Sequence, residues 1–107
     1  MRRLTTPTHT FTLPFDASVV DKFLLTYAQN DIIVLEKTGA DVSVDGNVWS
    51  VYFTQSETKK FKPGVAHCQV RVLTKDGQAV ASEVMTFPVM QVFNDDILES
   101  ETEEVEE

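Results

Sequence analysis

The chain has 107 residues, 42% of them hydrophobic, and a formal net charge of −8. This length fits one domain with a sizeable core and leaves no room for a second domain. The single cysteine excludes a disulfide within the chain and argues against a thiolate zinc site. No apolar stretch approaches the roughly 20 residues that a membrane span needs, so we expect no membrane partner.

The acidic residues are unevenly distributed along the chain. Nine of the 17 acidic residues precede residue 95 together with all nine Lys and Arg, so residues 1–94 sum to zero. The remaining acids crowd the segment 95–107, where like charges repel one another and bury nothing. The sequence therefore predicts three parts: a flexible N-terminal arm at 1–5, a β-domain at 6–94 and a disordered acidic tail at 95–107.

Alternation of apolar and polar residues is the dominant pattern, and it starts at Phe11–Phe15, which we predict to be a strand. Two further strands are expected at 22–29 and 32–37. Asn30 and Asp31 form a turn pair between them, so the two segments are predicted to make a hairpin.

A second hairpin is predicted at the centre of the chain. Strands at 41–44 and 47–54 flank Asp45-Gly46, and this dipeptide favours a type I′ turn with positive φ at both central positions. The return strand carries large apolar residues on both faces, so its inward face stays undecided from the sequence.

A short helical turn is expected next. Thr54 and Glu57 have the spacing of a capping box, in which a hydroxyl and a carboxylate satisfy the first backbone donors of a helix. Pro63-Gly64 ends the turn. Phe61 is expected to fill one end of the core.

The last part of the chain returns to strand-like alternation. The segment 65–74 is the clearest strand, Asp76-Gly77 forms a tight turn, and 79–93 is predicted to be strand with a break near Pro88. The fold class is thus an all-β, antiparallel, immunoglobulin-like β-sandwich of six to seven strands, with one short helical turn and the disordered acidic tail.

The sequence carries no assembled catalytic, cofactor-binding or metal-binding motif. Cys68 alternates with apolar residues, so a small buried hydrophobe is a better interpretation than a nucleophile. His9 and His67 lie on separate segments without ligand spacing, and we expect solvated or hydrogen-bonded imidazoles. We therefore expect no catalytic residue, no cofactor, no metal and no enzymatic activity.

Protein–protein contact is the remaining class of function. The neutral body and acidic chain argue against nucleic-acid binding, and no small-molecule substrate is expected. Outward-facing apolar residues are candidates for an interaction surface, if nothing covers them: Val48, Tyr52 and Leu73.

Several segments together carry a family resemblance. They are Thr5–Thr8, Phe11–Asp16, Leu35–Lys37, Thr54–Thr58, Gln69–Val72 and Asp76-Gly77. Across residues 1–98 the chain resembles a family of short proteins in phages and prophages of clostridia and related gut bacteria. The resemblance implies a virion-associated domain, similar to the small β-sandwich modules at the N-termini of phage baseplate and tail-fibre proteins. It offers no catalytic residues, and the acidic extension after Leu98 lies outside the pattern.

Two functions of different classes follow from these observations. The first is a structural or assembly module of a phage tail, baseplate or capsid, which contacts other virion proteins or forms a homo-oligomer. The alternative is a small acidic inhibitor of a host defence protein. The expected location is the virion or the host cytoplasm.

Overall fold

The structure is a computed structural model that describes residues 1–98. The strands are β1 (Thr8–Thr12), β2 (Val20–Gln29), β3 (Ile32–Lys37), β4 (Val42–Asp45), β5 (Val48–Tyr52), β6 (Gly64–Thr74), β7 (Ala79–Ala81) and β8 (Met85–Val89). One helix, α1 (Gln55–Lys59), and two 3-10 turns, Ala17–Val19 and Gly39–Asp41, complete the described elements.

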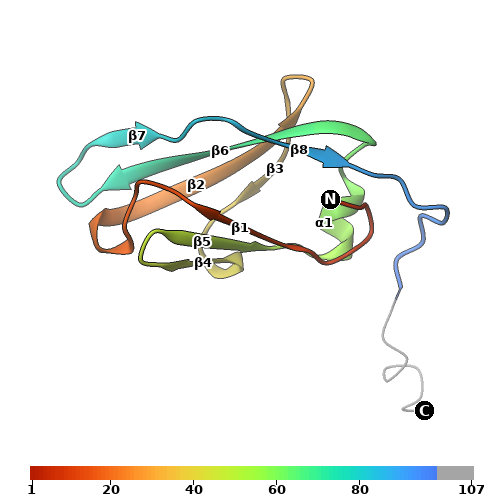
Figure 1. The fold of residues 1–107 in the computed structure, drawn as a ribbon, viewed down its shortest axis with the longest axis horizontal. Coiled ribbons are helices and arrows are strands. Elements are labelled where there is room, and N and C mark those ends of the chain that lie inside the picture. The colour runs from red at the N-terminus through yellow and green to blue at the C-terminus, as the bar shows by residue number, and fades with distance from the viewer. Residues whose placement is uncertain (99–107) are drawn as a thin grey trace, which may run out of the picture.

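The strands form two antiparallel sheets that face each other across one core (Figure 1). One sheet has the order β1-β5-β4; in the other, β3, β2 and β6 lie side by side, and both β7 and β8 pair with β6. The predicted all-β, antiparallel sandwich with one short helix is therefore confirmed.

The described strands number eight, and the extra one arises where the segment 79–93 divides. Ser82 lies between β7 and β8, and its side-chain oxygen accepts a hydrogen bond from the Val70 amide at 3.0 Å. This contact replaces one of the two ladder hydrogen bonds at that point, while the Ser82 N–H still donates to the Val70 carbonyl at 2.8 Å. The strand predicted over 79–93 is interrupted at 82–84, which the sequence did not indicate, and it ends at Val89, one residue after Pro88, close to the predicted break. Proline has no backbone N–H, so it fits a position on an edge strand where that N–H would point away from the sheet.

The core settles which face of β5 is inside. Trp49 and Val51 are fully buried, whereas Val48 and Tyr52 face solvent. The Trp49 ring meets Phe23 of the opposite sheet edge-on, with ring centroids 5.0 Å apart. Phe61, just after α1, is also fully buried and closes one end of the core as predicted.

The turns follow the sequence closely, with one difference. Asn30 (φ +53°) and Asp31 (φ +64°) form the β2–β3 turn, and the loop after Asp76 has Gly77 at φ +92°. Asp45, however, ends β4, and the β4–β5 loop consists of Gly46 and Asn47 with positive φ only at Gly46 (+61°). The predicted type I′ turn with both Asp45 and Gly46 at positive φ is therefore wrong, although Gly46 does supply the left-handed conformation.

Residues 1–5 are not a flexible arm, and this prediction is corrected. Arg3 is only 9% exposed. Its backbone N–H donates to the Met90 carbonyl at 3.0 Å, while the Met90 N–H donates to the Met1 carbonyl at 2.7 Å. The amino terminus thus lies beside α1 (Figure 1) and runs along the chain that leaves β8.

The predicted tail also begins later than expected. Asp95 forms an ion pair with Arg3 at 3.0 Å, and the Leu98 N–H donates to the Gln55 side chain at 2.9 Å. Residues 95–98 therefore contact the folded domain. The rest of the predicted acidic tail, 99–107, lies outside the described residues.

Candidate protein-interaction surface

The three apolar residues predicted to face solvent do so, but they do not form one surface. Val48 (39% exposed) and Tyr52 (47% exposed) lie on the outer face of β5. Leu73 (37% exposed) lies on β6 of the other sheet. The structure brings Val48 and Tyr52 onto one face and leaves Leu73 on the opposite layer.

Val48 and Tyr52 belong to a surface dominated by hydroxyl groups. In the β1–β5 ladder, Val48 lies opposite Thr12, Ser50 opposite Thr10 and Tyr52 opposite Thr8. This face is polar apart from Val48 and the Tyr52 ring. This face is therefore less apolar than the interaction surface that the sequence predicted.

Among the large apolar residues of the described strands, the most exposed lie at the start of β3, at Ile32 (68%) and Ile33 (59%). With Val34 they line a groove of about 370 Å³, which Lys60 and Lys62 complete from the other side. We call these five residues the β3 edge patch. Two adjacent exposed isoleucines are unusual in a strand, because one of them normally faces the core.

The β2–β3 hairpin explains this exposure. Its tip projects beyond the rest of the sandwich (Figure 1), so neither isoleucine has an opposing sheet to pack against. The turn at Asn30 and Asp31 has positive φ at both residues, which suits the tight connection of two twisted strands.

Gln29 holds Lys62 next to this tip. The side chain of Gln29 is 8% exposed. Its amide nitrogen donates to the Lys62 carbonyl at 2.7 Å, and its amide oxygen accepts from the Lys62 N–H at 2.8 Å. These two hydrogen bonds hold the chain after α1 against β2. They therefore place the positive charge of Lys62 beside Ile32 and Ile33.

β3 is an edge strand, since among the described residues it pairs only with β2. Unpaired edges are templates for strand addition unless charge, proline or a bulge protects them. Two such features protect β3: a register shift between Tyr27 and Ala28 leaves Val34 as a bulged residue, and Lys37 points inward at the C-terminal end. The two residues before the bulge, Ile32 and Ile33, are uncharged.

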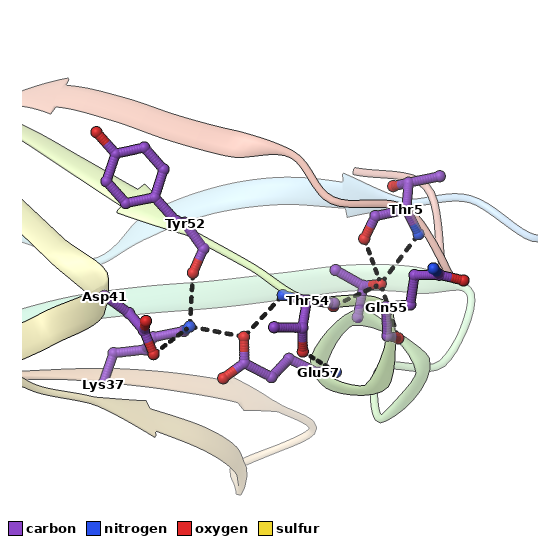
Figure 2. Close-up of polar contacts among 8 residues, drawn as sticks. Thr5, Lys37, Asp41, Tyr52, Thr54, Gln55 and Glu57 are labelled. Carbon is purple, nitrogen blue, oxygen red and sulfur yellow. Dashed lines mark hydrogen bonds and ion pairs between the residues drawn. The ribbon is translucent and has the colours of Figure 1, made fainter. Parts of the chain in front are cut away.

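Lys37 is the centre of a buried ionic cluster that ties β3 to α1. Its Nζ donates to the Tyr52 carbonyl at 2.6 Å and to Glu57 Oε1 at 2.7 Å, and Asp41 lies at 3.4 Å (Figure 2). The ammonium also lies 5.0 Å from the centroid of the Phe53 ring. Since the Lys37 side chain is only 2% exposed, these partners offset the loss of its hydration.

Glu57 has two roles in this cluster. The Thr54 N–H donates to Glu57 Oε1 at 2.9 Å while the Glu57 N–H donates to the Thr54 hydroxyl at 3.2 Å, which confirms the predicted capping box. Burial by itself would raise the pKa of Glu57, but the hydrogen bonds from Lys37 and the Thr54 backbone outweigh it and lower that pKa. The sequence identified the cap but missed the ion pair.

The residues with reactive side chains are arranged as structural groups. Cys68 is 3% exposed, and burial raises the pKa of its thiol to about 11, so it is present as the neutral thiol. The His67 ring contacts the Thr86 hydroxyl at 3.3 Å. Within residues 1–98 no three His, Cys, Asp or Glu side chains come close enough to hold a metal ion. In the same residues, no helix is long and apolar enough to cross a membrane.

Comparisons with known proteins add little. No protein-family model matches the chain, and no curated protein does. A solved structure, the V domain of amphioxus IgVJ-C2, is similar over 83% of this chain and 96% of that one, at 14% identity and a TM-score of 0.35. This likeness is too low to carry an argument about function, so the candidate surface stands on its own geometry.

Proposed function

We propose that this protein is a non-enzymatic assembly module that works through protein–protein contacts at the β3 edge patch. The observation that carries the proposal is the exposure of Ile32 (68%) and Ile33 (59%) on an edge strand. A partner strand that pairs with β3 gains main-chain hydrogen bonds and covers both isoleucines. Burial of these two side chains supplies the apolar part of the contact.

The charges around the patch favour a second copy as the partner. When two β3 strands pair antiparallel about Val34, Ile32 of one copy lies opposite Glu36 of the other. Lys60 and Lys62 border the groove at Ile32, so they would approach the carboxylate of the partner copy. A twofold contact repeats this attraction, which makes the surface self-complementary.

We further propose that the module works in a phage particle, where the partner is a virion protein or a second copy. The support for this setting is the sequence resemblance across residues 1–98, carried by segments such as Phe11–Asp16 and Thr54–Thr58. The acidic residues after Leu98 belong to neither the resemblance nor the patch.

The test is the solution mass of the full-length protein by light scattering across a concentration series. We expect association above the single-chain mass of 12.0 kDa, lost in Ile33→Lys and retained in Leu73→Lys. Leu73 is a matched control because it is an exposed apolar residue of the same sheet, remote from the β3 edge.

A wild-type chain that stays at 12.0 kDa at every concentration would exclude a second copy. The patch would then be tested against virion proteins with tagged wild-type and Ile33→Lys chains. Equal recovery of partners by both chains would refute the patch itself.

A further inference from the structure

A group of positive charges borders the β3 edge patch. Lys60 and Lys62 line its groove, and Lys59 precedes them as the last residue of α1. We call these three residues the lysine cluster. All three are exposed, and none of them forms an ion pair within residues 1–98. No Asp or Glu of the described residues lines the groove, so the surface favours an acidic occupant.

The chain enters the segment 99–107 close to this cluster. The Leu98 N–H donates to Gln55 Oε1 at 2.9 Å, and Gln55 Nε2 donates to the Leu98 carbonyl at 2.8 Å. Gln55 begins α1 and Lys60 follows its end, so these two residues lie roughly 8 Å apart along the helix axis. Nine extended residues span up to about 30 Å. The segment 99–107 is therefore long enough to reach the lysine cluster and the groove beside it.

The segment 99–107 has the complementary charge. Six of its nine residues are Glu and none is Lys or Arg, so it carries six of the eight net negative charges of the chain. These like charges repel one another unless positive charges lie close by. Another set of exposed cations lies at the opposite end of β2 and β6 from α1 (Figure 1): Lys22, Arg71 and Lys75. The two hydrogen bonds at Gln55 place the start of the segment beside the lysine cluster instead.

We propose that the segment 99–107 docks on the β3 edge patch of its own chain, with its glutamates against the lysine cluster, and shields the patch from partners. A segment attached this closely has an effective concentration in the roughly millimolar range, so weak ionic contacts are enough to hold it. Glu36 of a second copy competes with the segment for Lys60 and Lys62. The shielding therefore rests on the proposed assembly function, whereas the docking itself does not.

The first experiment measures docking in the full-length protein by paramagnetic broadening of amide NMR signals. A nitroxide is attached through Glu104→Cys. The native Cys68 is 3% exposed and burial raises the pKa of its thiol to about 11, so it reacts little with the label. The protein is kept at a concentration at which light scattering gives the mass of one chain. We expect broadening at Ile32 and Ile33 in about 0.01 M salt, its loss in about 1 M salt, and no effect at Leu73.

Two variants with the same label separate docking from closeness along the chain, and each removes three acidic charges. One changes residues of the segment: Glu101→Gln, Glu103→Gln and Glu106→Gln. The matched control changes exposed acids whose carboxylates make no ion pair within residues 1–98: Asp21→Asn, Asp45→Asn and Glu83→Gln. We expect the broadening at Ile32 and Ile33 to fall severalfold in the first variant and to stay unchanged in the second.

Two results of this experiment overturn the inference. Equal broadening in the parent and both variants would mean that the glutamates do not hold the segment on the patch. Broadening of an unlabelled copy that is mixed with the nitroxide-labelled protein would mean that the segment of a second copy occupies the patch.

Light scattering of the proteins without the label distinguishes a failure of shielding from a failure of assembly. We expect the segment variant to associate at a severalfold lower concentration than the wild type, and the matched control to associate as the wild type does. If all three stay at 12.0 kDa while the broadening persists, docking stands and assembly with a second copy is refuted. If the wild type and the segment variant associate alike, the patch assembles without being shielded, which overturns the inference.

Discussion

Replacing Arg3 by methionine tests whether the first residues belong to the folded domain. The Arg3 guanidinium donates to the Phe61 carbonyl at 2.7 Å and to the Lys59 carbonyl at 3.0 Å. Both carbonyls lie at the C-terminal end of α1, where backbone acceptors have no partner within the helix. Methionine keeps an unbranched apolar stem of similar reach but has no N–H to donate.

The expected loss follows from these contacts. The buried Phe61 carbonyl, once left without its partner, costs roughly 1–3 kcal/mol, and the part-buried Lys59 carbonyl, on an exposed residue, costs less. The ion pair with Asp95 adds at most about 1 kcal/mol, because the Asp95 side chain is 50% exposed and well screened by water. We therefore expect Arg3→Met to lower the free energy of unfolding by roughly 3 kcal/mol.

The assay is urea unfolding followed by the fluorescence of Trp49, the only tryptophan, which is fully buried. Arg2→Met is the matched control, since Arg2 is exposed and donates to a single backbone carbonyl, that of Gln91, at 2.9 Å. We expect the control to lose less than about 0.5 kcal/mol. Equal stability of the two variants would refute the reasoning and restore the flexible arm that the sequence predicted.

Three further variants probe the β4–β5 turn, the Lys37 ionic cluster and the buried Tyr27 hydroxyl. Gly46→Ala should lose about 1 kcal/mol in the same urea assay, because φ is +61° and no atom lies within 4 Å of the added carbon; an unchanged midpoint would contradict the strained turn. Because the folded pKa of Glu57 is below its ordinary 4.5, its stabilisation is present above that value and is lost as the pH falls through the folded pKa. Thermal melts between about pH 6 and pH 2 should therefore fall less steeply for Glu57→Gln than for the wild type, and parallel curves would exclude the Lys37 contact as the cause. Tyr27→Phe should leave stability nearly unchanged or raise it, since the buried hydroxyl has only the Cys68 thiol, a weak hydrogen-bonding group, beside it; a loss of about 1 kcal/mol or more would show that this contact is stabilising.

Local patterns in the sequence predict most of the fold. The strand predicted at 32–37, after the Asn30-Asp31 turn, matches β3 at both ends, and the Thr54–Glu57 spacing predicts the capping box. These features depend on residues a few positions apart, so a single segment contains all the information. The type of the β4–β5 turn was missed. Asp45 can lie either at the end of β4 or in the loop, and the Asp-Gly sequence is the same in both cases.

Contacts between distant segments were beyond this kind of prediction. Lys37 continues the inward alternation after Leu35, but a charge at a core position is normally taken as the end of a strand. Its burial depends on partners from other segments, Tyr52 and Glu57. Arg3 is similar, since its acceptors lie after α1, and nothing near residue 3 in the sequence indicates them.

The candidate surface shows the same limit. In a strand with period-two alternation, one of Ile32 and Ile33 would face the core. Both are exposed because the β2–β3 hairpin projects beyond the sandwich. The sequence left the inward face of β5 undecided, because both faces carry large apolar residues, and the structure places Trp49 and Val51 inside and Val48 and Tyr52 outside. The groove beside Lys60 and Lys62 depends on the buried Gln29 side chain, which has no distinctive sequence pattern.

The pairing of Met1 and Arg3 with Met90 also sets the order in which the chain can complete its fold. The hairpins β2–β3, β4–β5 and β6–β7 join neighbouring segments and can form as soon as each is made. The first residues, in contrast, find their partner only after β8 has been synthesised. A nascent chain that stops before Met90 could form its hairpins, but residues 1–3 would have no partner. We therefore expect the pairing of these first residues with Met90 to be a late, non-local and comparatively slow step of folding.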